Sequence, residues 1–121
     1  MHRTFLLIGA LAGCIAVGFG AFGAHGLKGR ISPEHLITFE TGVRYQMYHA
    51  LALLGVALAA PHLASRLVTA AGWLFTAGMV LFSGSLYVLV LAGIPMMGAV
   101  TPLGGVAFMA GWLCLVAAAL R

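Results

Sequence analysis

Residues 67–93, LVTAAGWLFTAGMVLFSGSLYVLVLAG, run for 27 positions without a charged side chain. Crossing about 30 Å of hydrocarbon takes about 20 helical residues at about 1.5 Å each, so this stretch is long enough to span a membrane as a helix. The whole chain agrees, because 63% of its 121 residues are hydrophobic and its mean hydropathy is +1.12. Soluble domains are only about 45–50% apolar. The sequence therefore predicts an integral membrane protein.

Three further apolar blocks accompany this stretch, at residues 4–24, 45–60 and 103–120. The short links between the blocks contain helix-ending and helix-starting residues: Lys28-Gly29-Arg30, Ser32-Pro33, Pro61-His62, Ile94-Pro95 and Thr101-Pro102. We therefore predict an all-α fold, a four-transmembrane-helix bundle formed by one domain over residues 1–121. Its helices are expected at about 4–24, 33–60, 67–93 and 102–120.

The second block is too short to cross a membrane unless its helix starts before residue 45. Ser32 is a good N-cap, Pro33 suits the first helical position, and Glu34 favours the positive end of the helix dipole. A helix over 33–60 would be about 42 Å long, which exceeds the hydrocarbon thickness. We expect a bend or break near Gly42, with residues 33–42 forming a short amphipathic interfacial helix between membrane helices 1 and 2.

The first block allows two interpretations. Leu11-Ala12-Gly13-Cys14, preceded by Arg3, matches a bacterial lipoprotein signal, which would be cleaved before a lipidated Cys14. The apolar run continues for ten residues beyond Cys14, however, where a lipoprotein would have a polar tether. We therefore expect a retained membrane helix.

Small residues recur every three or four positions in the first block, which places them on one helical face where a neighbouring backbone can approach closely. The fourth block has similar glycines. We interpret both sets as intramolecular helix packing, with the seam of a homo-oligomer as the alternative. The residues are Gly9, Gly13, Ala16, Gly20, Gly23, Gly104, Gly105 and Gly111.

The net charge of +4 does not indicate nucleic-acid binding, because the six basic residues are scattered singly between apolar blocks. If the helices alternate in direction, Arg3, Arg66 and Arg121 lie on one side of the membrane, called side A. Lys28, Arg30 and Arg44 then lie on the other, called side B. This balance leaves the orientation open. Discounting a deep Arg44 favours cytoplasmic termini, and insertion in both orientations with antiparallel dimers remains an alternative.

Polar side chains are predicted to converge on side B, where helix 1 ends, helix 2 begins, helix 3 ends and helix 4 begins. An ionisable group in hydrocarbon costs about 2.5–3.5 kcal/mol, so it usually faces protein or water and has a partner. Glu40 and Arg44 have the spacing and order of a helical ion pair. The predicted polar cluster consists of His25, Glu40, Arg44, Tyr45, Tyr48, His49, Ser83, Ser85 and Tyr87.

The cluster has two interpretations of its own. Tyrosine and arginine commonly form an interfacial belt that extends toward lipid headgroups. Alternatively, the residues form a polar pocket for a headgroup, solute, ion or partner helix.

Neither a metal site nor catalysis is indicated. His25, His49 and His35 lie near side B, but the sequence has no HxxxH or CxxC motif. The chain contains only two acidic residues, and Ser83-Gly84-Ser85 lacks the preceding strand of a nucleophile elbow. Cys14 and Cys114 are expected to be buried, inert thiols. We expect no cofactor, no metal and no enzymatic activity.

Several segments resemble one known family. GAFGAHGLK at 20–28, FETGVRYQMYHALALL at 39–54, LFSGSLY at 81–87, TPLGG at 101–105 and Gly111-Trp112 are similar to the bacterial domain-of-unknown-function 423 family, which resembles the transmembrane-protein-256-like proteins. The resemblance covers the whole chain, and Arg-Tyr-Gln-Met-Tyr-His is its most specific part. It implies a small inner-membrane protein with about four helices, and no known activity.

We therefore expect a multi-pass protein of the cell inner (cytoplasmic) membrane with an accessory or scaffolding role. Its side-B cluster would bind a lipid headgroup or a partner membrane protein. The alternative is a small solute or ion transporter, possibly oligomeric, in which Ser83, Ser85, Tyr87 and His49 reach inward. A haem or metal carrier is a third hypothesis.

Overall fold

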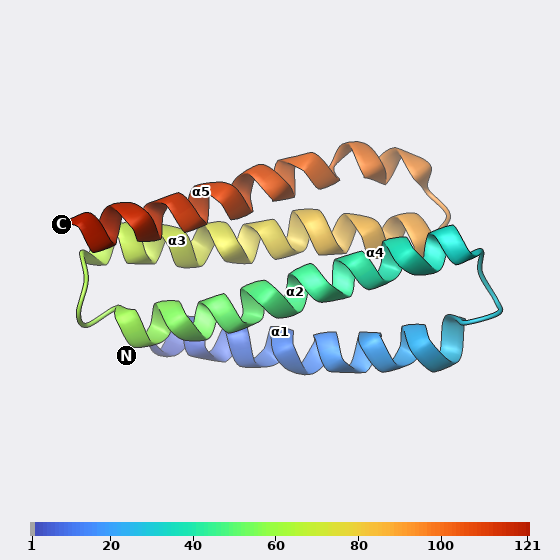
Figure 1. Ribbon diagram of the computed structural model, residues 1–121, viewed down its shortest axis with the longest axis horizontal. Coiled ribbons are helices and arrows are strands. Elements are labelled where there is room, and N and C mark those ends of the chain that lie inside the picture. The colour runs from blue at the N-terminus through green and yellow to red at the C-terminus, as the bar shows by residue number, and fades with distance from the viewer. Residues whose placement is uncertain (1) are drawn as a thin grey trace.

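The computed structural model describes residues 2–121, apart from the side chain of Ser65, and in this range the chain forms helices and no strands. Four long helices account for most of it (Figure 1). In chain order the elements are α1 (Arg3–Ala21) with the π-helical η1 (Phe22–Leu27), α2 (Pro33–Ala59), α3 (Ser65–Gly78) with the π-helical η2 (Met79–Ser83) and α4 (Gly84–Leu91), the 3₁₀ helix η3 (Pro95–Ala99), and α5 (Thr101–Leu120).

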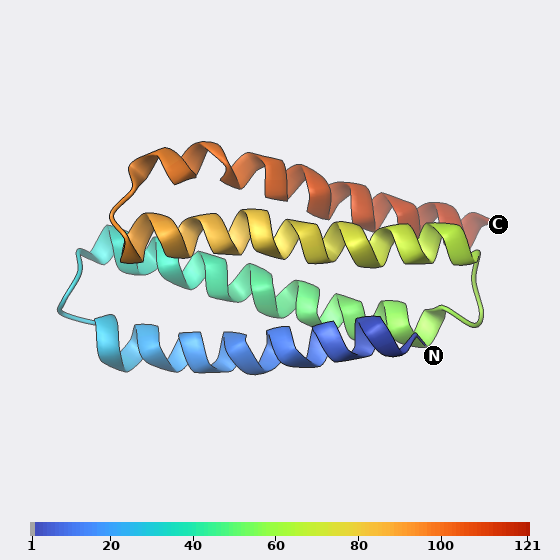
Figure 2. The same ribbon diagram turned by 180° about the vertical axis from the view of Figure 1, so that it is seen from behind.

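The four long helices lie side by side and alternate in direction (Figures 1 and 2). The η1–α2 and α4–α5 connections lie at one end of the molecule (Figure 1), which contains Lys28 and Arg30 of side B, whereas Arg44 lies near the middle of α2. The α2–α3 connection and both chain ends lie at the other end, which contains the residues assigned to side A. The predicted up-and-down order of the helices is therefore present.

The N-terminus of α2 follows the expected capping pattern. The Ser32 side chain accepts a hydrogen bond from the His35 backbone N–H at 3.1 Å, Pro33 takes the first position, and Glu34 lies in the first turn. Two glycines with positive φ, Gly29 at 83° and Gly93 at 67°, follow the ends of η1 and α4. Such angles are strained for other residues, so these glycines allow the chain to leave each helix.

The predicted break near Gly42 is absent, because α2 is one continuous helix from Pro33 to Ala59. A separate interfacial helix is likewise absent between η1 and α2. Gly42 instead allows close packing: a Cβ there would lie 3.0 Å from Tyr87 Cε1 and 3.4 Å from Leu86 Cβ. Its carbonyl oxygen also accepts a hydrogen bond from Ser83 Oγ at 2.6 Å. A glycine within a helix can allow either a bend or a close approach of a neighbouring helix, and the contacts of Gly42 with Tyr87 and Ser83 show that it allows the close approach.

The small-residue stripe of α1 faces α2. A Cβ added at Gly9 would lie 2.8 Å from the Ala50 carbonyl oxygen, and one at Gly23 would lie 3.1 Å from the Phe39 ring. Gly13 and Gly20 are in looser contact with Ala50 and Val43, and Ala16 is buried. Small side chains therefore let the first two helices approach closely.

Glycines also set the contact between α5 and the third long helix, which consists of α3, η2 and α4. A Cβ at Gly104 would collide with the backbone of Phe82, and one at Gly111 would lie 2.7 Å from the Phe75 ring. Gly105 differs from the prediction, because nothing lies within 4 Å of a Cβ there. Cys14 differs too, because it is exposed on α1.

Three helical stretches are long and apolar enough to cross a membrane: Arg3–Leu27, Arg66–Leu91 and Pro95–Leu120. The stretch of α2 between Arg44 and His49 is polar, and α2 is not among them. Large apolar side chains are exposed along the molecule, including Leu7, Val80, Leu113 and Leu120. An exterior of this composition is suited to lipid contact.

Candidate functional site

The predicted polar cluster is divided between two faces of α2. Glu40, Arg44 and Tyr48 follow one another at four-residue intervals and are exposed, whereas Gln46 and His49 are buried, at 7% and 4% exposure. The buried pair lies on the same helical face as Phe39, Gly42 and Leu53. The inner residues bond other helices, and the outer residues face away from the molecule.

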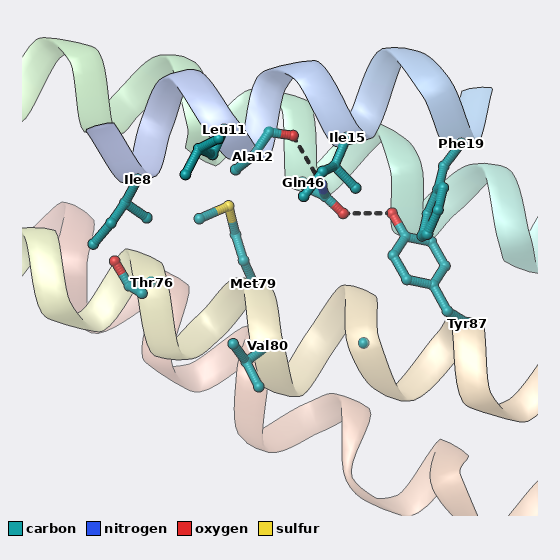
Figure 3. A pocket seen from close by; sticks show the side chains of 11 residues that line it. Ile8, Leu11, Ala12, Ile15, Phe19, Gln46, Thr76, Met79, Val80 and Tyr87 are labelled. Atoms are coloured by element: carbon teal, nitrogen blue, oxygen red, sulfur yellow. Dashed lines mark hydrogen bonds between the residues drawn. The ribbon is translucent and has the colours of Figure 1, made fainter. Parts of the chain in front are cut away.

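Gln46 connects three helices. Its Nε2 donates to the Ala12 carbonyl oxygen of α1 at 2.8 Å, and its Oε1 accepts from the Tyr87 hydroxyl of α4 at 2.7 Å (Figure 3). A carbonyl oxygen can only accept, so the nitrogen of the Gln46 amide must face Ala12 and its oxygen must face Tyr87. Phe19 and Phe39 pack around the Tyr87 ring, with ring centroids 4.9 and 5.2 Å away.

His49 joins α2 to α5. Its Nδ1 lies 2.7 Å from the Tyr45 carbonyl oxygen, and its Nε2 accepts a hydrogen bond of 3.1 Å from Trp112 Nε1. Both bonds are satisfied by the neutral tautomer that carries its proton on Nδ1. The imidazole also stacks on Phe108, with centroids 3.6 Å apart and planes 7° apart. His49 is thus fully used by contacts within the chain.

Two buried serines tie η2 and α4 to their neighbours. Ser83 donates to the Gly42 carbonyl oxygen, and Ser85 shares a 2.6 Å hydrogen bond with Thr101 at the start of α5. Ser85 also bonds the Phe82 carbonyl oxygen at 2.8 Å. A π-helical turn leaves backbone groups irregularly placed, and Ser85 bonds one such carbonyl oxygen, that of Phe82 in η2.

The outer residues make few contacts. The Arg44 guanidinium bonds Thr41 Oγ1 at 3.4 Å, and the expected ion pair with Glu40 is not formed within residues 2–121. Tyr48 is 53% exposed and packs on Tyr45, whose ring also contacts Phe82. Arg44 and Glu40 are therefore free to meet groups outside the chain.

His25 does not join the buried residues. It is exposed in η1, which lies level with the start of α2, because Gly23 packs against Phe39. His49 is about three helical turns further along, near the level of Gly13. Within residues 2–121, moreover, no three histidine, cysteine or acidic residues lie close enough together to hold a metal ion.

A cavity of about 430 Å³ lies between α1 and the third long helix. Figure 3 shows Gln46 and Tyr87 on its wall, joined by their hydrogen bond, with Ile8, Met79 and Val80 further along. The polar residues of this site thus reach the middle of α2 and are not confined to the side-B edge.

Gln46 and Trp112 were not predicted as site residues. The sequence does place Gln46 on one helical face with Phe39, Gly42, His49 and Leu53, and the structure shows that this face is buried. Trp112 could not be assigned in the same way, because the residue is 46% exposed and its hydrogen bond to His49 depends on how α5 packs against α2.

The helical architecture, the apolar exterior and the buried polar contacts define an all-helical membrane protein. The family model described as "Protein of unknown function (DUF423)" matches residues 19–105. The chain belongs to this family, as the resemblance of its motifs predicted.

Curated relatives agree over nearly the full length. The UPF0382 membrane protein YwdK of Bacillus subtilis (strain 168) is 52% identical over 120 residues, covering 98% of each chain. The UPF0382 membrane protein SAB0533 of Staphylococcus aureus (strain bovine RF122 / ET3-1) is 49% identical over 119 residues, covering 98% of this chain and 97% of the relative. No solved structure matches the chain.

Proposed function

We propose that the chain crosses the cytoplasmic (inner) membrane four times, with α2 as the fourth span. Its support is topological. α1 with η1 ends at side B and α3 begins at side A (Figure 1). If both of these apolar helices cross the bilayer, the segment between them must cross back. With 27 residues, about 40 Å, α2 is long enough to do so.

The role that we propose is non-enzymatic: an accessory or scaffolding protein that binds a partner membrane protein through the outer face of α2. Its single main support is the state of Arg44, an exposed cation on a membrane-crossing helix without a carboxylate partner in residues 2–121. Such a residue is costly in hydrocarbon and usually has a partner. Glu40, one turn away, presents the opposite sign, so a partner helix carrying both charges would complement this face.

A headgroup is the less favoured ligand for this face, because the Glu40 carboxylate would repel a lipid phosphate bound at Arg44. Transport is less favoured too. Apart from one N–H of Gln46, the polar side chains that point inward are bonded to one another or to backbone groups, as at Ser83, Ser85 and His49. A solute pathway would need polar groups free to bind its cargo.

The test is site-specific photocrosslinking in native membranes. With p-benzoyl-phenylalanine in place of Tyr48, we expect one discrete protein adduct, whereas the same group in place of Met109 on the exposed face of α5 gives none. Arg44→Gln should reduce the Tyr48 adduct about tenfold, equivalent to about 1.4 kcal/mol of binding free energy. Arg66→Gln, which removes an exposed arginine at side A, should leave the adduct unchanged.

The adduct's mass identifies the partner. A mass of twice the chain would make the partner a second copy, as in a homo-oligomer. Adducts of phospholipid alone, equal at positions 48 and 109, would overturn the proposal.

A further inference from the structure

The cavity beside Gln46 is a slot with closed ends. At side A, Phe5 of α1 packs over Gly72 and contacts Trp73, with their ring centroids 5.1 Å apart. At side B, the Phe19 ring of α1 contacts the Tyr87 ring edge to face, with the ring centroids 4.9 Å apart. Between these contacts α1 and the third long helix stand apart, and α2 forms the floor with Gln46 (Figure 3).

The slot opens sideways, toward the surrounding membrane. Leu11, Ile15 and Val80 line it and are also exposed on the outer surface, at 56%, 49% and 67%. Its α1 wall extends from Ile8 to Phe19, about 16 Å along the helix axis. The volume of about 430 Å³ falls in the usual range of small-molecule sites, about 300–1,000 Å³.

The lining is apolar and uncharged, with polarity concentrated at Gln46 and Tyr87. Thr76, the other polar residue there, donates its hydroxyl hydrogen to the Gly72 carbonyl oxygen of its own helix at 2.8 Å. A charged ligand would find no counter-ion in this lining. The occupant must therefore be neutral and largely apolar.

Gln46 retains hydrogen-bonding capacity on the wall of the slot. Its amide carries two N–H donors, and one of them bonds Ala12. The second has no partner within residues 2–121, on a residue that is only 7% exposed. A ligand with a carbonyl oxygen would satisfy this donor.

The depth of Gln46 decides which carbonyl compounds fit. Gln46 is the middle residue of α2, about 20 Å from each end of the helix. The ester carbonyls of phospholipids lie at the edges of the hydrocarbon, about 15 Å from its centre. A carbonyl that reaches Gln46 must therefore belong to a molecule dissolved within the hydrocarbon.

We propose that this slot binds a neutral membrane quinone, with a ring carbonyl accepting the free Nε2–H of Gln46. The aromatic rings of Phe19 and Tyr87 border the position of the quinone ring, and its apolar tail follows Ile15, Met79 and Val80 toward the bilayer. The site needs α2 to cross the membrane, as proposed above, but it does not involve the outer face of α2 or Arg44.

The experiment measures equilibrium binding of decylubiquinone to the purified full chain in lipid nanodiscs. We expect saturable binding of one molecule per chain, with decylbenzene, which has a six-membered ring and the same tail but no oxygen substituents, binding at least about tenfold more weakly. Gly84 lines the slot and has nothing within 4 Å of an added Cβ, so Gly84→Leu should fill the slot and abolish binding. Gly55 has equally free space but lies outside the slot, so Gly55→Leu should bind like the original chain.

Two further variants keep the outcome decisive. Val80→Phe blocks the slot from its exposed rim. It should also abolish binding, and it replaces Gly84→Leu in the experiment if that variant does not fold. Gln46→Leu should weaken decylubiquinone binding about tenfold and leave decylbenzene binding unchanged. Non-saturable uptake that is equal in all variants, or equal binding of decylubiquinone and decylbenzene, would overturn the proposal. Neither result would bear on crosslinking at Tyr48, so the two proposals fail separately.

Discussion

At the scale of single residues, the buried polar groups of this protein work as pairs between helices. Gln46 with Tyr87, His49 with Trp112 and Ser85 with Thr101 each join two long helices. In a membrane, apolar contacts between helices gain little over contacts with lipid tails, so packing and hydrogen bonds hold helices together. The dense run of polar side chains between Arg44 and His49 therefore serves the assembly of the molecule as well as its surface.

The bond between Trp112 and His49 gives a prediction at this scale. Trp112→Phe keeps an aromatic ring but removes the donor to His49 Nε2, leaving a buried acceptor unpaired. We expect a loss of about 0.6–1.7 kcal/mol in the free energy of unfolding, the range found for hydrogen bonds between membrane helices. Dodecyl sulfate titration of the protein in mixed micelles measures it.

Trp73→Phe is the matched control, because the Trp73 ring contacts Phe5 but its N–H makes no hydrogen bond within residues 2–121. An equal loss of stability in both variants would mean that ring size, and not the hydrogen bond, accounts for the effect.

Which polar residues meet could be predicted from the sequence only in part. Convergence of the helix ends on side B follows from alternating helices, and Ser83, Ser85, Tyr87 and His49 do face other helices. The rotation of α2 about its axis could not be predicted, because polar residues lie on both its exposed face, as at Glu40 and Arg44, and its buried face, as at Gln46 and His49. Glu40 and Arg44 share a face, as their spacing predicted, but Arg44 bonds Thr41 and the expected ion pair is not formed within residues 2–121.

At the scale of the elements, glycine has three different roles here that look alike in sequence. Gly93 ends a helix with positive φ, Gly42 admits the Tyr87 ring, and Gly105 contacts nothing. Helix boundaries were predictable from Ser32, Pro33 and the loop prolines. The π-helical turns η1 and η2 were not, because no residue type specifies a π turn.

Neighbouring glycines of α5 give a prediction at this scale. Gly104→Ala places a methyl group against the backbone of Phe82, which cannot rotate away as a side chain could. We expect destabilisation of about 1–3 kcal/mol from this overpacking. Gly105→Ala meets empty space, so it should leave stability unchanged or raise it by up to about 1 kcal/mol through helix propensity.

Thermal unfolding of the two single variants in the same detergent compares them directly. The α5–α3 contact described above would be incorrect if Gly104→Ala were as stable as Gly105→Ala.

At the scale of the whole molecule, the outer charges and the inner slot lie on different faces of α2. Arg44 faces outward, whereas Gln46 forms the floor between α1 and the third long helix. The two proposed binding sites can thus be occupied together. Partner binding on the outer face need not disturb the hydrogen bonds of Gln46 that tie α1, α2 and α4.

The proposed fourth span determines where the loops lie, and this gives the last prediction. In a variant with Cys14→Ala and Cys114→Ala, single cysteines replace Lys28, His62 or Met96, three exposed positions in or near connections. If all four helices cross, positions 28 and 96 lie on side B and position 62 on side A. A membrane-impermeant maleimide added to intact cells should therefore label either positions 28 and 96 but not 62, or position 62 but not 28 and 96.

Inverted vesicles should reverse this pattern. Labelling of positions 28 and 62 from the same side, with position 96 labelled from the other, would mean that α2 does not cross the membrane. Partial labelling of every position from both sides would keep four crossings but show two orientations. That result would follow physically from the balance of Arg3, Arg66 and Arg121 against Lys28, Arg30 and Arg44, because the distribution of basic residues sets orientation.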